Sequence, residues 1–146
     1  MIVNLKGRLE AKGKDHVVLD VGGIGFKVYV PTSLLGELNG VGDQVKLFTH
    51  LHVRENELAL YGCGSKEELA LFELLLSVPG IGPKAALAIL STLSIDSLHL
   101  AVAQGKPEVL ARVPGIGMKT ARKLIFDLKD KLEVELAPAA PMLTEA

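Results

Sequence analysis

The sequence Val78-Pro79-Gly80-Ile81-Gly82 recurs unchanged 35 residues later as Val113-Pro114-Gly115-Ile116-Gly117. In both copies a lysine, Lys84 or Lys119, follows the second glycine by two positions. Apolar residues at helical spacing flank each copy, so each copy predicts a tight turn between two helices. Because a solenoid needs about three or more repeats, two copies indicate a pair of helix–turn–helix units that share one core.

Both turns are candidate binding sites for DNA phosphates. Glycine permits backbone angles that are closed to other residues and leaves main-chain N–H groups accessible. Each turn ends at a helix N-terminus, where unpaired N–H groups and the helix dipole favour an anion. The dipole slightly disfavours a lysine there, unless that lysine reaches a bound phosphate. The residues expected to contact the DNA backbone are Gly80, Gly82, Lys84, Gly115, Gly117, Lys119, Arg122 and Lys123. We expect Ile81 and Ile116 to point into the core and anchor the turns.

Charge is unevenly distributed along the chain. The whole sequence carries a net charge of -1. Between residues 84 and 131, however, eight Lys and Arg residues stand against four Asp and Glu residues. A local excess of positive charge favours a polyanion bound on one face.

The first sixty or so residues have the patterning of a small β-barrel. Apolar alternation and β-branched runs predict strands over 5–11, 17–21, 26–30, 44–53 and 58–61, with a short helical turn over 31–38. Glycine-rich turns separate these segments. Five short strands with a helix between the third and fourth favour a closed barrel of the oligonucleotide-binding (OB) type.

The pattern becomes helical after Gly64. Ser65 and Glu68 have the spacing of a capping box, and helices are expected over 66–77, 83–92, 96–104, 107–112 and 119–134. The sequence therefore predicts two domains, α+β overall. They are a five-stranded OB-type barrel over 1–63 and an all-α domain with the two turns over 64–135. A Pro/Ala-rich linker over 136–146 follows.

Several other kinds of site are not expected. Cys63 is the single cysteine, which excludes an internal disulfide and cysteine-rich metal clusters. His50 and His52 lie two apart on a strand without an evident third ligand, so we expect them to be packed or partly exposed. No catalytic residue, metal or cofactor is expected. The sequence lacks a signal peptide and a membrane-length apolar run, which favours a cytoplasmic protein.

Other classes of protein match parts of the sequence. Gly80-Ile81-Gly82-Pro83-Lys84-Ala85 matches a dinucleotide-binding pattern but lacks the preceding strand. DNA glycosylase/lyases place a lysine where Lys119 stands, but they need an aspartate on a later helix, and Asp127 and Asp130 share the helix of Lys119. A nuclease or repair module with the same turns, and a single-strand binder that uses the barrel, remain open. The latter relies on exposed aromatic residues, which are few here.

The two turns resemble the helix-hairpin-helix family. A barrel followed by two such hairpins resembles the RuvA family of bacterial Holliday-junction-binding proteins. The likeness extends through residues 1 to about 135, and further matching segments are 22–26, 49–50, 53–55, 60–62 and 87–91.

That resemblance implies a function and its partners. Members bind four-way (Holliday) DNA junctions without sequence preference and hold them open and square. They form a homotetramer, or an octamer on DNA, and have no catalytic site. An acidic barrel loop, the pin, sits at the crossover and corresponds to Glu55, Asn56 and Glu57. A third, C-terminal domain recruits the RuvB motor, which drives branch migration by ATP hydrolysis in homologous recombination and DNA repair.

Two departures from the family pattern stand out. The pin usually carries two adjacent acids, whereas Asn56 occupies the second position here and Glu57 follows it. The chain also ends soon after the Pro/Ala-rich segment, so we expect it to lack the third domain. On that expectation it binds junctions without coupling to the motor.

Overall fold

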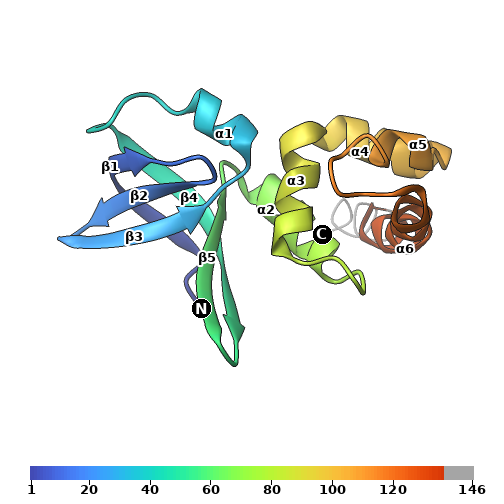
Figure 1. The fold of residues 1–146 in the computed structure, drawn as a ribbon, viewed down its shortest axis with the longest axis horizontal. Coiled ribbons are helices and arrows are strands. Elements are labelled where there is room, and N and C mark those ends of the chain that lie inside the picture. Colours follow the sequence, from blue (N-terminus) through green and yellow to red (C-terminus); the bar gives the residue numbers. More distant parts are fainter. Residues whose placement is uncertain (137–146) are drawn as a thin grey trace, which may run out of the picture.

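The computed structural model describes residues 1–136, which form a barrel followed by a helical region (Figure 1). The strands are β1 (Asn4–Lys12), β2 (His16–Val21), β3 (Ile24–Tyr29), β4 (Gln44–Arg54) and β5 (Glu57–Cys63). The helices are α1 (Thr32–Glu37), α2 (Lys66–Leu76), α3 (Pro83–Thr92), α4 (Ile95–Gln104), α5 (Pro107–Leu110) and α6 (Met118–Leu136). This confirms the expected α+β order, an N-terminal five-stranded barrel and then helices.

The barrel closes in the order β1-β2-β3-β5-β4, with α1 between β3 and β4 in sequence. All its strand pairs are antiparallel except the parallel pair of β3 and β5, in which Val28 lies opposite Leu60. Alternate residues of β1, such as Leu5 and Leu9, face the barrel core. The strands match the sequence-based ranges to within a few residues at each end. β5 exceeds its predicted range of 58–61 by the most residues, because its pairing with β4 continues from Glu57 to Cys63.

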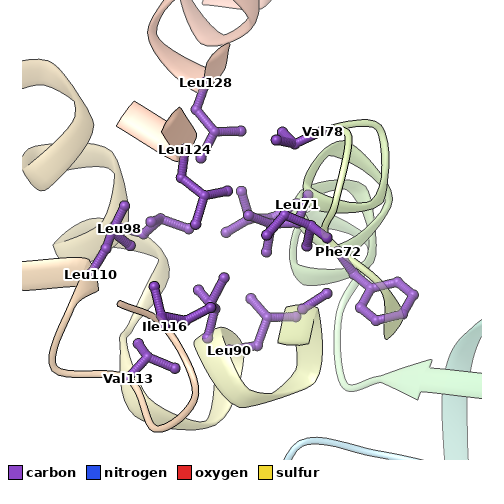
Figure 2. Close-up of a cluster of buried hydrophobic side chains, with 14 of the residues drawn as sticks. Leu71, Phe72, Val78, Leu90, Leu98, Leu110, Val113, Ile116, Leu124 and Leu128 are labelled. Carbon is purple, nitrogen blue, oxygen red and sulfur yellow. The ribbon is translucent and has the colours of Figure 1, made fainter. Parts of the chain in front are cut away.

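The helical region packs around one core that includes residues from both turns (Figure 2). Ser65 caps α2, since its hydroxyl oxygen accepts a hydrogen bond from the Glu68 N–H at 3.1 Å. The reciprocal bond of a full capping box, from the Ser65 N–H to the Glu68 carboxylate, is not found among the described residues. The predicted capping box is therefore only half formed.

The barrel and the helical region share a packed junction. Tyr61 and Cys63, near the end of β5, belong to the helical core rather than to the barrel core. The Tyr61 ring stacks on Phe72 of α2 with centroids 5.6 Å apart. The His50 ring nitrogen Nδ1 lies 2.8 Å from the Glu73 carboxylate, which links β4 to α2. These contacts hold the barrel against the helices that carry the turns.

No helix within residues 1–136 is by itself long and apolar enough to cross a membrane. Helices α3 and α4 together pass the same length and composition test, but they are bent by 99° at their junction. Both helices also contribute buried side chains to the helical core, including Ile89 and Leu98.

Candidate nucleic-acid interface

The two repeated turns have nearly identical backbone geometry. In hairpin 1 (residues 78–82) the Ile81 N–H donates to the Val78 carbonyl at 3.1 Å, and in hairpin 2 (residues 113–117) the Ile116 N–H donates to the Val113 carbonyl at 3.0 Å. The third residue of each turn, Gly80 or Gly115, has φ of 90° or 88°. Proline in the second position and a positive φ in the third define a type II β-turn.

Buried apolar side chains anchor both hairpins. Val78 and Val113 are each 1% exposed, and Ile81 and Ile116 are each 7% exposed. All four belong to the helical core, where Figure 2 shows Val78, Val113 and Ile116. The expectation that the two isoleucines anchor the turns is confirmed. The glycine backbone between the anchors is left at the surface.

The two glycines of each hairpin serve different purposes. Glycine permits backbone angles that are closed to other residues, but only one glycine of each hairpin uses this freedom. Only the first glycine of each pair has a positive φ, and Gly82 has φ of -94°. A Cβ atom added at Gly82 or at Gly117 would meet nothing within 4 Å. Neither backbone strain nor crowding therefore requires the second glycine, and the space beside it is open.

The second glycines are the residues from which the next helices begin. The Gly82 carbonyl accepts from the Ala86 N–H at 3.0 Å, and the Gly117 carbonyl accepts from the Ala121 N–H at 2.9 Å. No acceptor within the described residues takes the N–H of Gly80 or Gly82, nor that of Gly115 or Gly117. Lys84 and Lys119 are both exposed in the first turns of α3 and α6. Each hairpin thus combines free N–H groups, a helix N-terminus and a cation, which is an anion-binding arrangement.

Arg122 and Lys123 lie on α6 and are exposed, but their surroundings differ. The Lys123 ammonium donates to the Pro79 carbonyl of hairpin 1 at 2.8 Å. Lys131, further along α6, donates to the Ser77 hydroxyl at 2.7 Å. Thus α6, which begins at hairpin 2, touches hairpin 1 as well. The Lys131 contact was not anticipated, and nothing in the local sequence signals a bond across 54 residues.

The candidate pin is the tip of the β4–β5 hairpin, which projects beyond the rest of the barrel (Figure 1). Arg54 pairs with Glu57 across the two strands, which leaves Glu55 and Asn56 in the turn. All four residues are exposed. Glu57 therefore starts β5 instead of sharing the tip with Glu55.

A groove of about 970 Å³ runs between the barrel and α3. Residues of β3 and β5 line one wall, and Leu87 and Ala88 of α3 line the other. Glu57 from the pin, Lys84 from the first repeat and Pro114 from hairpin 2 line it as well. The groove thus brings the pin and both repeats to one surface feature.

The structure also places the single cysteine and the two histidines that the sequence analysis considered. Cys63 is fully buried, and burial raises the pKa of its thiol far above the ordinary range, so the thiol stays protonated and packs as a small apolar group. His50 and His52 are half-buried, and the His50 ring meets Phe72 edge-on at 5.8 Å. Among the described side chains of residues 1–132, no group of three or more metal-binding side chains comes together.

Comparisons with known proteins agree with this geometry. The family model described as "RuvA N terminal domain" matches residues 1–62, and the one described as "SAM-like Helix-hairpin-helix tandem" matches residues 72–130. A protein named "Holliday junction branch migration complex subunit RuvA" from Dehalococcoides mccartyi (strain CBDB1) is 48% identical over 132 residues, which is 90% of this chain and 68% of the relative. The chain belongs to the RuvA family.

Two further relatives with the same name extend the match. The one from Caldanaerobacter subterraneus subsp. tengcongensis is 47% identical and covers all of this chain and 79% of its own length. The one from Thermoanaerobacter sp. (strain X514) is 51% identical over 136 residues, which is 93% of this chain and 73% of the relative. The RuvA family match therefore includes the barrel, the pin segment and both hairpins.

Proposed function

We propose that this chain binds four-way DNA junctions through the phosphate backbones of their arms, without regard to base sequence. The observation that carries this proposal is the pair of hairpins with matching geometry, each of which presents free N–H groups beside an exposed lysine. Contacts of this kind read phosphates and carry no base information. Hence two equivalent contacts per chain suit a ligand with regularly spaced phosphates.

The proposed contacts follow from the exposed groups of each repeat. Gly80, Gly82 and Lys84 would hold one phosphate, and Gly115, Gly117 and Lys119 would hold another. Arg122, exposed on α6, adds a further cation. This assignment is supported by helix N-termini acting as anion sites and by the absence of a crowding neighbour at the second glycines.

The preference for a junction over plain duplex comes, in this proposal, from the pin. Glu55 and Glu57 are exposed carboxylates, and Glu57 lines the same groove as Lys84. Carboxylates repel nearby phosphates, so they disfavour a continuous duplex across the tip. At a junction, where strands separate, the same charges would hold the centre open.

The relatives are named as subunits of a branch migration complex, and we extend that role to this chain as a binding subunit without catalysis of its own. Four copies around one axis would place the pins together, as the family resemblance implies. Val53 and Leu58 flank the tip as an exposed cross-strand pair, 66% and 72% exposed. Contact between copies would cover this apolar pair. Sedimentation of the protein alone and with junction DNA tests the tetramer.

A gel-shift comparison tests the function directly. The wild-type chain is titrated into a four-way junction and into a duplex of the same arm sequence, across a salt series. Tighter binding to the junction is expected at every salt concentration. Equal affinity for both DNAs would contradict the junction claim and leave only backbone binding.

A paired substitution tests the hairpins. Lys84→Gln with Lys119→Gln should weaken binding to all sequences alike. It should also flatten the slope of log K against log salt by about two units for each subunit engaged, since each lost phosphate contact contributes about 0.9. Lys6→Gln with Lys46→Gln is the charge-matched control, because these exposed lysines pair across β1 and β4, far along β4 from the pin.

A lyase activity is the alternative that the geometry favours least. Such chemistry pairs a lysine nucleophile with a separate aspartate. Asp127 lies eight residues after Lys119 on the same helix, which separates their backbones by about 12 Å along the axis. An incision assay on DNA with an abasic site tests this alternative, and we expect no cleavage above that of the Lys119→Gln variant.

A further inference from the structure

We propose that Lys123 is a positioning residue for hairpin 1. Its ammonium group reaches hairpin 1 from α6 and stabilises the observed orientation of the peptide between Pro79 and Gly80. The Gly80 N–H is thereby aimed outward for a phosphate. The consequence for DNA rests on the proposed function, whereas the contact itself needs no DNA.

The contact joins two segments that lie far apart in the sequence. Lys123 follows hairpin 2 in sequence, yet its Nζ donates to the Pro79 carbonyl at 2.8 Å. A Cβ atom placed on Gly80 would lie 3.9 Å from the same Nζ. Lys131, two turns further along α6, donates to the Ser77 hydroxyl at 2.7 Å and to the Ser77 carbonyl at 3.3 Å. Two lysines of α6 therefore hold the segment that leads into hairpin 1.

The geometry of the peptide bond decides what Lys123 does there. The bond between Pro79 and Gly80 is trans, like every described peptide bond, so its C=O and N–H point to opposite sides. Because Lys123 takes the C=O side, the Gly80 N–H points away from Lys123. A phosphate bound to that N–H would lie on the far side of the peptide from the Lys123 ammonium. Lys123 thus orients the donor instead of contacting the same phosphate.

The local sequence leaves this orientation open. Proline at the second position of a turn fits both type I and type II, and these differ by a flip of the central peptide. Glycine at the third position tolerates either φ. The Lys123 bond stabilises the arrangement in which Gly80 has φ of 90°. Hairpin 2 adopts the same turn without such a bond, with φ of 88° at Gly115, so the Lys123 bond adds stability to an orientation that the sequence already allows.

Hairpin 2 has no equivalent support, which makes it an internal control. The 35-residue offset of the repeat places Ala88 of α3 at the position that matches Lys123. Ala88 and Pro114 line the same groove, so the matching location beside hairpin 2 carries a methyl group. Among the described side chains of residues 1–132, none donates a hydrogen bond to the Pro114 carbonyl. Loss of Lys123 should accordingly alter hairpin 1 alone.

Nuclear magnetic resonance of the DNA-free full chain tests the contact. In Lys123→Met the Pro79 carbonyl and Gly80 amide nitrogen resonances should move, and those of Pro114 and Gly115 should stay in place. Lys129→Met replaces another exposed lysine of α6, one outside both hairpins, and as the charge-matched control it should move neither pair. Lys123 is exposed, so all variants should fold, as thermal melting verifies. An unmoved Gly80 resonance in Lys123→Met would overturn the proposal.

Junction binding separates a positioning role from a direct phosphate contact. Lys123→Met should weaken junction binding roughly tenfold with little change in the salt slope, and Lys123→Arg should restore most of the affinity. A slope that falls by about 0.9 per subunit, as for a lost phosphate contact, would overturn the positioning role. If the wild-type chain shows no preference for junctions, the proposed function fails, and the resonance shifts still decide the contact.

Discussion

At the scale of single residues, the two glycines of each hairpin differ in whether the fold requires them. Gly80 and Gly115 have positive φ values, a region in which other residues are strained. Gly82 and Gly117 have ordinary φ and open space around the missing side chain. The identical spacing in sequence hides this difference. Only the backbone angles show which glycine the turn itself needs.

We therefore expect Gly82→Ala with Gly117→Ala to leave the fold intact and to weaken DNA binding. Replacing glycine at compatible angles removes freedom from the unfolded chain, and this gain offsets the lower preference for alanine at a helix N-cap, so the free energy of unfolding should change by less than about 1 kcal/mol per site. The added methyl groups would obstruct the approach of a phosphate to the N–H groups. Urea unfolding and junction gel shifts on the same protein measure both effects.

The matched pair Gly80→Ala with Gly115→Ala should behave differently. Positive φ strains an alanine by about 1–2 kcal/mol at each site, so this variant should unfold at lower urea concentration. If the Gly82 and Gly117 variant binds junctions as well as wild type, the second glycines do not face the DNA. The assignment of the phosphate site to the hairpins would then need revision.

At the scale of elements, the start of α2 shows how burial alters a familiar motif. Ser65 caps the helix, but the Glu68 carboxyl lies near Cys63 rather than bonding back to Ser65. Burial is the largest influence on the pKa of Glu68 and raises it above 4.5. A hydrogen bond with Cys63 lowers the pKa of Glu68, and the charge of Glu37 raises it further. The folded chain therefore holds the Glu68 proton to a higher pH than the unfolded chain does.

That raised pKa predicts a dependence of stability on pH. Between pH 4.5 and the higher native pKa, the folded chain binds more protons at Glu68 than the unfolded chain does, so stability falls as pH rises. Glu68→Gln cannot ionise and should gain stability relative to wild type between pH 4 and pH 7. The gain should stay below about 1 kcal/mol, because water screens a half-buried group. Thermal melting at both pH values measures it.

The control for this prediction lies one residue earlier. Glu67→Gln removes one negative charge from the same exposed helical turn and isolates the effect of charge number. A difference between Glu68→Gln and wild type that stays constant from pH 4 to pH 7 would contradict the raised pKa. Gln at position 68 is also a residue type that a capping box accepts there.

The elements themselves follow closely from local sequence, and the exceptions have physical causes. Alternation in β1 and the helical spacing around Phe72 each report burial on one face, which is a local property. Pairing is not local. The extension of β5 to Cys63 depends on its pairing with Phe48 of β4, and the closure of the barrel depends on the parallel pairing of Val28 with Leu60. No short window of sequence contains either partner set.

At the scale of the whole molecule, the groove between the barrel and α3 relates the parts of the candidate site. It is lined by Glu57, Lys84 and Pro114, residues from three separate segments. Sequence patterns identified each segment, but the groove depends on how α2 docks on the barrel through Tyr61 and Phe72. The same limit applies to Lys123, whose contact with hairpin 1 requires the packing of α6 before it can form.

Because the pin borders this groove, we can predict how its charges affect the preference for a junction over duplex DNA. Glu55→Gln with Glu57→Gln removes two carboxylates and preserves shape, so repulsion of phosphates near the tip falls. Duplex binding should then strengthen more than junction binding. The ratio of the two affinities should consequently drop by roughly tenfold, as gel shifts at matched salt would show. The control for net charge is Glu10→Gln with Glu37→Gln, which replaces two exposed acids on the barrel outside the pin. An equal drop in the affinity ratio of that variant would mean that general repulsion, not the pin, sets the preference.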